Sequence, residues 1–424
     1  MASFTTTATT HKAVLLPPTT SGLCNAGERL RSGGLVAFPT ETVYGLGANA
    51  LDEAAVRSIF TTKGRPLTDP LIVHVPTQTE ALNLLELDSE TASIYELLAT
   101  TFWPGPLTLV GKAVAAIPLA VTAGTGFVGI RCPKHDLARR LLIEARVPVA
   151  APSANRFGHV SPTTAHHVYQ DLGTHDIAIV DGESSSVDSN SNSNSNKELK
   201  TDGKKKKNTN KETCSVGIES TVLKVDGDTK TIVLFRRGGI SEAALRKALD
   251  GTGYTIQALN KQVPHDPSAV PKEDNANAND TTTTTEIAAT ENGQQAPGQC
   301  LTHYAPDVST SLVHNTDTTV EVCPAPLSSC VVIDFGGHLA HLETQVLGYR
   351  DLSKNGDVSE AAHQLFDTLR WTEGVEGAVH VLLTDVRIVE AERAPNKLLN
   401  YEHLEAVADR MFRAASGRCV KLEI

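Results

Sequence analysis

Phe38-Pro39-Thr40-Glu41-Thr42-Val43-Tyr44-Gly45-Leu46-Gly47, followed one helix later by Lys63-Gly64-Arg65-Pro66, is the stretch that decides the fold of this chain. The apolar run at residues 35–38 predicts a buried strand that leads into the first loop. Asp52 can cap the next helix, whose apolar spacing places Lys63 on its inward side. Two cations on a turn stiffened by glycine and proline suit phosphate, and the Thr/Glu/Tyr loop can orient a small polar substrate. The stretch therefore indicates a nucleotide site.

Each half of this pattern is common by itself. A lone Lys-x-Arg is most often a solvated helix end, and a Pro-Thr-Glu-Thr segment is most often a turn before a helix cap. Further unusual segments follow, and such a series is hard to reach by chance: Asp69-Pro70-Leu71-Ile72-Val73-His74, Trp103-Pro104-Gly105-Pro106-Leu107-Thr108, Gly129-Ile130-Arg131-Cys132-Pro133, Ala151-Pro152-Ser153-Ala154-Asn155, Gly217-Ile218-Glu219-Ser220-Thr221 and Arg236-Arg237-Gly238-Gly239.

Composition limits the class of protein. The 424 residues are 40% hydrophobic, enough for two or more buried cores, and carry a formal charge of -11. That charge argues against a uniformly basic nucleic-acid binder, although a local basic cleft stays open. No apolar run is long enough to span a membrane. The seven cysteines include no Cys-x-x-Cys pair, which excludes a zinc ribbon and favours a reducing compartment. We expect a cytoplasmic protein, with mitochondrial import as the alternative because the N-terminus is rich in threonine and lacks acids.

Strand and helix patterns alternate along the chain and predict an α/β fold with an open, twisted, mixed sheet. A small second α/β domain of Rossmann-like type follows. The predicted strands lie near residues 35–38, 71–75, 107–110, 128–130, 147–151, 331–334 and 379–383, and the predicted helices near 52–63, 92–98, 137–145, 362–369 and 404–411.

Composition also marks the boundaries. Residues 1–22 are expected to be a disordered tail, 23–245 the first domain, 246–306 a linker with a candidate active-site lid, and 307–424 the second domain. Within the first domain, residues 184–213 change to Ser/Asn repeats and four consecutive lysines, which predicts a disordered insertion.

At the quoted motifs the chain resembles the threonylcarbamoyl-adenylate synthase family, which has a YrdC-like catalytic domain and, in its longer members, a C-terminal domain. The YrdC-like resemblance covers roughly residues 23–240. It implies an enzyme that joins L-threonine, bicarbonate and ATP to give threonylcarbamoyl-adenylate and pyrophosphate. That product then serves a separate transferase, which modifies the adenosine beside the anticodon of certain tRNAs.

The resemblance also implies residue roles. Lys63 and Arg65 would hold the ATP phosphates, and Ser153 and Asn155 would flank the point where the substrates meet. Further nucleotide contacts would come from Asn155 again and from Asp69, Thr163, Arg236 and Tyr304. Threonine contacts would come from Thr42, His74, Arg131, Ser153 and Ser220, with the Arg131 guanidinium suited to bidentate capture of the carboxylate.

The chemistry of these residues agrees with the resemblance. A carbamate that adds to a phosphate needs positioning and charge neutralisation more than a covalent nucleophile. Mg²⁺ would arrive bound to ATP, because no compact carboxylate cluster predicts a protein metal site. His303-Tyr304-Ala305-Pro306 resembles the segment that closes over the cleft in long family members, and a plain domain-boundary turn is the alternative.

Simpler readings stay open for single residues. Arg131 could be an ordinary strand-end arginine paired with an acid, His74 a satisfied strand histidine and Ser153 a turn cap. The sequence also departs from the family at Phe127, where relatives have a small hydroxyl residue, and at Asp69, where many have Asn.

Two other functions compete with the synthase. A carbamoyl-adenylate-forming relative of the hydrogenase-maturation type would require Cys-x-x-Cys pairs, which are absent. An RNA-binding module that lacks synthase activity is the alternative from another class, since the cationic cleft could follow a phosphate backbone.

Overall fold

The computed structural model describes residues 12–184, 214–259, 294–297, 303–314, 320–393 and 403–422. Within them an 11-stranded mixed sheet runs in the order β1-β8-β2-β3-β7-β4-β6-β5-β9-β10-β11. Its strands are β1 Val14–Leu16, β2 Leu35–Phe38, β3 Gly45–Asn49, β4 Ile72–His74, β5 Leu107–Lys112, β6 Phe127–Arg131, β7 Val149–Ala150, β8 Ile177–Val180, β9 Thr221–Asp226, β10 Thr231–Arg236 and β11 Thr255–Ala258.

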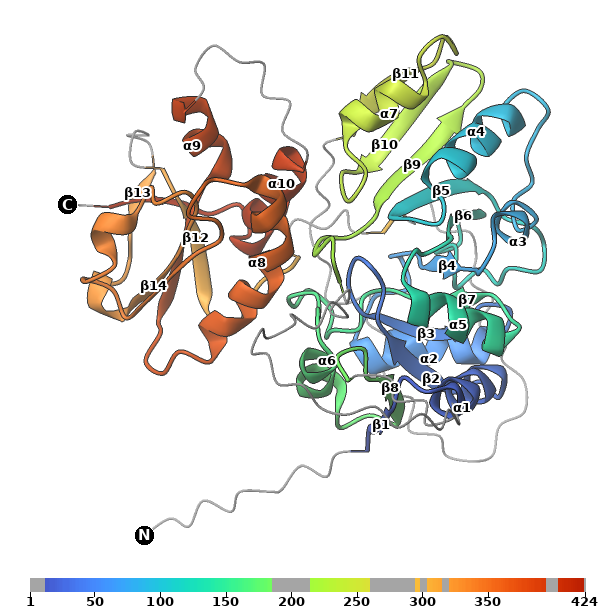
Figure 1. Cartoon of the computed structure of the whole chain (residues 1–424), viewed down its shortest axis with the longest axis horizontal. Coiled ribbons are helices and arrows are strands. Elements are labelled where there is room, and N and C mark those ends of the chain that lie inside the picture. The colour runs from blue at the N-terminus through green and yellow to red at the C-terminus, as the bar shows by residue number, and fades with distance from the viewer. Residues whose placement is uncertain are drawn as a thin grey trace, which may run out of the picture.

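Helices cover this sheet and complete the larger lobe (Figure 1). They are α1 Thr20–Arg31, α2 Glu53–Lys63, α3 Gln78–Leu82, α4 Ala92–Phe102, α5 Asp136–Ala145, α6 Ala165–Leu172 and α7 Glu242–Ala248. Side chains of β2 alternate between two cores, as the period of a strand requires. Val36 and Phe38 pack with α1 and α5, whereas Ala37 belongs to the core that contains α2 and α4.

The smaller lobe is a second sheet in the order β13-β17-β12-β16-β14-β15, and every strand pair described in it is parallel. Its strands are β12 Ser309–Val313, β13 Glu321–Val322, β14 Cys330–Asp334, β15 Gly348–Asp351, β16 His380–Thr384 and β17 Cys419–Lys421. Its helices are α8 Val358–Glu373, α9 Val386–Arg393 and α10 Leu404–Ala414, with 3₁₀ turns at Leu327–Ser329 and Ala340–Leu342. The predicted fold class, a mixed sheet followed by a smaller Rossmann-like α/β domain, is confirmed.

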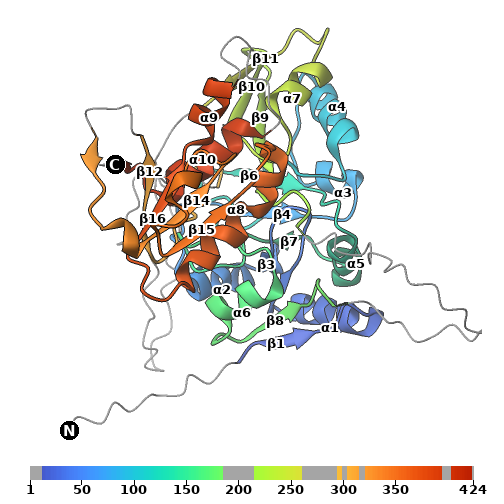
Figure 2. The same ribbon diagram turned by 60° about the vertical axis from the view of Figure 1, so that its left-hand side comes forward.

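Helices α8 and α10 lie on the side of the smaller lobe that faces the larger one (Figures 1 and 2). One hydrophobic core joins the lobes, because Val43, Val160 and Ile218 pack with Phe366 and Met411. The turn at Gly217 approaches α8 so closely that an added Cβ would lie 2.4 Å from the Cα of His363. The two lobes therefore share a packed interface.

The local structure that places Lys63 follows from the sequence. Asp52 accepts hydrogen bonds from the amides of Ala54 and Ala55 at 2.9 and 3.2 Å, so α2 begins where the capping signal predicts. Gly64 ends the helix in the left-handed conformation, with φ of 63°. Lys63 is thus the last helical residue and is buried against the Ser153–Asn155 turn, and the prediction that it points inward is confirmed.

Two expected boundaries need correction. Residues 12–22 are not a free tail, because β1 pairs in parallel with β8 and α1 begins at Thr20. A three-residue edge strand and a helix that opens with Thr-Ser-Gly give too weak a pattern to detect. The expected linker begins too early, since α7 starts at Glu242 and β11 extends the large sheet through Ala258. Most of the expected insertion and the remaining linker, residues 185–213, 260–293 and 298–302, lie outside the described residues. Among the helices described, none combines the length and apolarity needed to cross a membrane.

Candidate active site

A cavity opens where the Pro39–Gly47 loop meets the ends of β4, β6 and β10. Seven of the predicted site residues lie on its wall: Thr42, Arg65, His74, Arg131, Ser153, Ser220 and Arg236. Three more wall residues are polar and escaped prediction, namely Thr40, Glu219 and His303. Segments separated by more than 200 residues in sequence therefore converge on one site.

Lys63 lies just behind this wall and holds the Ser153–Asn155 turn. Its ammonium group donates to the carbonyl oxygens of Ser153, at 2.6 Å, and Asn155. The side chain is 4% exposed, and no carboxylate of the described residues lies within ion-pair distance of it. Burial, and next the charge of Arg65, lower the pKa of Lys63 well below its ordinary value. An anionic ligand here would therefore be stabilised by an uncompensated cation.

Arg65 and Asp69 form a buried ion pair at 2.9 Å, with side chains 4% and 0% exposed. Arg65 also donates to the carbonyl oxygens of Asp69 and Pro70, at 3.1 and 2.9 Å, and its guanidinium lies 5.9 Å from the centre of the Phe157 ring. Asp69 does not reach the cavity wall. In this arrangement Asp69 holds Arg65 in place instead of facing the cavity itself.

Arg131 lies at the end of β6 and pairs with Glu41. Glu41 belongs to the loop at residues 39–47, but no role for it was predicted from the sequence. The Nη2 group donates to Glu41 Oε1 at 2.7 Å, while the buried Nε has no hydrogen-bond partner in the described structure. Glu41 Oε2 accepts the amides of Lys134 and His135 at 3.0 and 3.3 Å. Burial disfavours the ionised form of Glu41, yet Arg131 outweighs it and lowers the pKa of Glu41.

His74 faces the same cavity from the end of β4. Burial, followed by repulsion from Arg131, lowers the pKa of His74 to about 3, so the ring is neutral at physiological pH. Its edge meets Phe38 with the ring centres 6.1 Å apart, and Nδ1 has no partner in the described structure. Thr42, on the loop opposite, exchanges a 2.8 Å hydrogen bond with Thr40.

The far wall of the cavity is tied to the smaller lobe. Arg236 donates to the backbone oxygen and to Oγ of Ser220, both at 3.1 Å. Glu219 accepts from Ser161 at 2.9 Å and from the fully buried Arg410 of α10 at 3.1 Å. Because Glu219 precedes Ser220, the C-terminal helix braces a residue of the wall.

Three predicted contacts lie off the wall. Asn155 is buried and donates to the carbonyl oxygens of Arg156 and His159 at 2.6 and 2.8 Å. Thr163 contacts the ring of His167 at 3.4 Å. Tyr304 is 1% exposed behind His303, with its ring 5.3 Å from Phe366. Its unusual positive φ of 63° turns the His303–Tyr304 pair toward the interface, so His303 forms the cavity wall.

One group of metal-type ligands occurs in the described residues, formed by His159, Asp307 and Glu373 within 4.8 Å of one another. It lies between the lobes and outside the cavity. Hydrogen bonds already occupy it, since Glu373 accepts from His159 and Asp307 accepts from Arg156. The cavity acids Glu41 and Glu219 are likewise engaged by arginines.

Both lobes of the chain are similar to known proteins. Residues 28–195 match the Sua5, YciO and YrdC family model, described as "Telomere recombination", and residues 240–416 match the one described as "Threonylcarbamoyl-AMP synthase, C-terminal domain". A threonylcarbamoyl-AMP synthase of Pyrococcus abyssi is 32% identical over 394 residues, which cover 93% of this chain and 94% of that protein. The chain belongs to the threonylcarbamoyl-AMP synthase family. The predicted enzyme class, a nucleotidyltransferase, is confirmed with it.

Other members of the threonylcarbamoyl-AMP synthase family match mainly one part of the chain. The Bacillus subtilis protein is 38% identical over 241 residues, 57% of this chain and 60% of its own length. Among solved structures, that of P. abyssi Sua5 complexed with L-threonine superposes with a TM-score of 0.67 at 28% identity, covering 96% of this chain and 99% of that one. The family fold thus extends through both lobes.

Proposed function

We propose that this chain joins L-threonine, bicarbonate and ATP into threonylcarbamoyl-AMP and pyrophosphate in the cavity described above. The environment of Arg131 is the observation that supports this proposal most directly. Arg131 lines the cavity, and Glu41 accepts a hydrogen bond from one nitrogen of its guanidinium. The Nε of the same group is buried and has no partner in the described structure. A buried orphan donor on a cation indicates that an anion completes its hydrogen bonds. The carboxylate of an amino acid would do so.

The threonine end of the site would be the side that Arg131 and His74 share. Arg131 would hold the carboxylate, and the neutral His74 could accept or donate one hydrogen bond without adding charge. Thr42, Ser153 and Ser220 offer hydroxyl groups on the same wall, suited to the side chain and amine of threonine. The L-threonine complex of the P. abyssi protein supports this assignment.

The ATP end would be the side of Lys63, Arg65 and Arg236. These cations would neutralise the phosphates while the carbamate oxygen of N-carboxythreonine attacks the α-phosphorus and pyrophosphate leaves. Asn155 would keep the Lys63 turn in shape, and Asp69 would keep Arg65 aimed at the cavity. Mg²⁺ would come in with ATP and shield its phosphate charge, since the cavity acids are held by arginines.

Thr163 and Tyr304 would serve the nucleotide after the two separate segments that carry them move, because neither faces the cavity here. A lid of this kind would exclude water from the labile mixed anhydride. We further propose that the product passes to a separate transferase that acts on tRNA. The six cysteines of the described residues are all free thiols, which supports a reducing compartment such as the cytoplasm.

The direct test is pyrophosphate release by the purified protein with ATP, Mg²⁺, bicarbonate and a panel of amino acids. Release that requires both threonine and bicarbonate is the expected result. Release with any amino acid would contradict the threonine site while leaving adenylate chemistry intact. No release, together with salt-sensitive retention of RNA, would replace the synthase with the RNA-binding alternative.

A further inference from the structure

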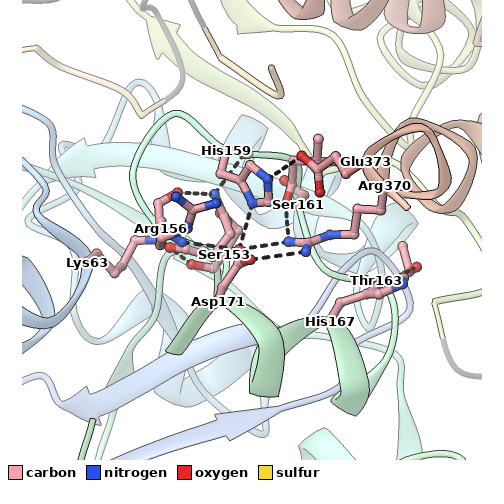
Figure 3. Close-up of polar contacts among 12 residues, drawn as sticks. Lys63, Ser153, Arg156, His159, Ser161, Thr163, His167, Asp171, Arg370 and Glu373 are labelled. Atoms are coloured by element: carbon pink, nitrogen blue, oxygen red, sulfur yellow. Dashed lines mark hydrogen bonds and ion pairs between the residues drawn. The ribbon is translucent and has the colours of Figure 1, made fainter. Parts of the chain in front are cut away.

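The imidazole of His159 lies between two carboxylates that belong to different lobes (Figure 3). Its Nδ1 is 2.8 Å from Asp171 on α6, and its Nε2 is 2.7 Å from Glu373 at the end of α8. The side chains of His159 and Asp171 are 5% and 3% exposed. The ring therefore bridges the lobes and is itself mostly buried, beside an open pocket that Asp171 and Glu373 also line.

A neutral imidazole carries only one N–H, so it cannot donate to both carboxylates at once. Both short contacts are satisfied only when both ring nitrogens are protonated. The geometry is thus that of an imidazolium between two anions. In the uncharged ring, one nitrogen lone pair would face a carboxylate oxygen at 2.7 or 2.8 Å, which is repulsive.

Other charged groups pack around the ring and have to be counted. Arg370 of α8 pairs with Asp171 at 2.8 Å, Arg156 pairs with Asp307 at 2.9 Å, and His167 lies on the same helix as Asp171. Burial and the charge of Arg370 oppose protonation of His159, whereas Asp171 and Glu373 favour it, and the net effect raises the pKa of His159. Burial, Arg370 and His159 itself lower the pKa of His167 to about 3, so His167 adds no charge.

This bridge is connected to Lys63 through a short chain of hydrogen bonds. The backbone oxygen of His159 accepts from the side-chain Nδ2 of Asn155 at 2.8 Å, and the backbone oxygen of Asn155 accepts from the Lys63 ammonium. The amide of Phe157 donates to the Lys63 carbonyl at 2.9 Å. Asp171 also acts directly, because its negative charge favours the protonated form of Lys63.

We propose that His159 and Asp171 are positioning residues for the Lys63 turn, and that Glu373 of α8 holds His159 there only while His159 is protonated, whereas Arg370 keeps Asp171 in place in either state. The inference rests on the proposed phosphate role of Lys63. It gives the C-terminal lobe a part in the reaction, since Glu373 and Arg370 complete the bridge from outside the catalytic lobe. It also makes the nucleotide end of the site dependent on pH.

The sign follows from the direction of each shift. The pKa of His159 is raised in the folded protein, so its contribution is complete below the ordinary histidine value and is lost as pH rises through the raised value. Despite the cost of burial, His159 and Arg370 lower the pKa of Asp171, which therefore stays ionised throughout that range. The bridge is therefore complete below the ordinary histidine pKa and weakens as the pH rises through the raised pKa of His159.

The test is the pH profile of pyrophosphate release in Glu373→Gln. Glu373 is 22% exposed on its side chain, so the variant should fold. We expect kcat/KM for ATP to fall with rising pH in the wild type and to begin falling at lower pH in the variant. At neutral pH the KM for ATP should rise about fivefold or more, with a smaller change in the KM for threonine. His166→Gln, an exposed histidine of α6, is the matched control and should keep the wild-type profile.

The ionisation itself can be followed without turnover, by NMR titration of the ring nitrogens in ¹⁵N-histidine-labelled full-length protein. A His159 pKa above the ordinary value that drops in Glu373→Gln is expected. An unchanged pH profile in an active Glu373→Gln enzyme would overturn the inference. A wild-type protein that releases no pyrophosphate would refute the proposed function instead, while the titration would still show whether the bridge exists.

Discussion

Buried cations occur in two regions of this molecule, and the regions differ in whether a carboxylate of the protein pairs with each cation. At the interface between the lobes, Arg370 and Arg410 each meet a carboxylate of the larger lobe, at 2.8 Å in Asp171 and 3.1 Å in Glu219. At the nucleotide end of the cavity, Lys63 and Arg236 are held only by hydroxyl and carbonyl oxygens within the described structure. The two interface arginines are neutralised by protein carboxylates, whereas Lys63 and Arg236 are not, and Arg65 is the exception at the nucleotide end because it pairs with Asp69.

The difference has a physical meaning. A buried charge with no counter-ion is costly, and the cost shows in the lowered pKa values of Lys63 and Arg236, with burial as the main cause in each. Buried charges without a counter-ion are typical of binding sites, where a bound ligand supplies the opposite charge. Interface arginines hold the lobes together, whereas cavity cations stay open to anions.

The largest effect expected at the interface comes from Arg410→Met. The change removes a fully buried guanidinium and leaves Glu219 without its cation, so the free energy of unfolding should fall by about 3–5 kcal/mol. Urea denaturation measures the loss. The double variant R410M/E219Q removes both charges and should recover most of it. A single variant as stable as wild type would show that the interface pair contributes nothing.

Lys63→Ala should show the reverse pattern, with activity lost and stability kept. Removing the buried ammonium group relieves a desolvation cost, which offsets the loss of its hydrogen bonds to the carbonyl oxygens of Ser153 and Asn155, so the melting temperature should change little. Pyrophosphate release should fall about 10²- to 10³-fold, as for other single electrostatic groups aimed at a reacting centre. Lys112→Ala is the control, since that side chain is 68% exposed on β5. Near-normal turnover in K63A would remove Lys63 from the site.

The two regions also differ in how many of their residues could be predicted from the sequence. The cap at Asp52 and the apolar spacing of the helix that follows it placed Lys63 correctly, because capping and helix period are local signals. The cavity wall contains seven of the twelve predicted residues, which came from motif resemblance. The exact cavity partners stayed hidden, since the pairing of Glu41 with Arg131 joins residues 90 positions apart.

The interface was not predicted at all. Asp171, His159, Arg370 and Glu373 belong to no motif, and each reads as an ordinary polar residue on its own helix or turn. Their contacts depend on how the two lobes pack against each other, which no local pattern encodes. Glu219 could have been noticed, because it lies inside a quoted segment beside Ser220. The edge strand β1 was missed because its three residues give too weak a pattern and its partner β8 lies more than 150 residues later.

Gly217→Ala separates close packing at the interface from backbone strain. At φ of 76°, an alanine there pays for the left-handed conformation and also collides with α8, 2.4 Å from the Cα of His363. Gly251 has nearly the same φ of 75° with nothing within 4 Å, so Gly251→Ala reports the strain alone. We expect about 1 kcal/mol for G251A and about 2–3 kcal/mol for G217A in denaturation experiments. Equal losses would mean that the lobes adjust freely at this contact.

The smallest expected effect tests whether one arginine can be paired with a protein carboxylate, like the interface arginines, and still bind an anion in the cavity. Arg131 has a carboxylate partner, as interface arginines do, yet it also lines the cavity and keeps a buried Nε without a partner in the described structure. In Glu41→Gln the shape is kept but the charge that fixes Arg131 is lost, and an amide group replaces one acceptor of the Lys134 and His135 amides. The KM for threonine should rise about tenfold, equivalent to about 1.4 kcal/mol, with the KM for ATP unchanged. Glu53→Gln, half-exposed on α2, is the control. If the KM for threonine stays constant, the simple reading of Arg131 as a structural ion pair is right, and the carboxylate of threonine has to be held by another cation of the cavity.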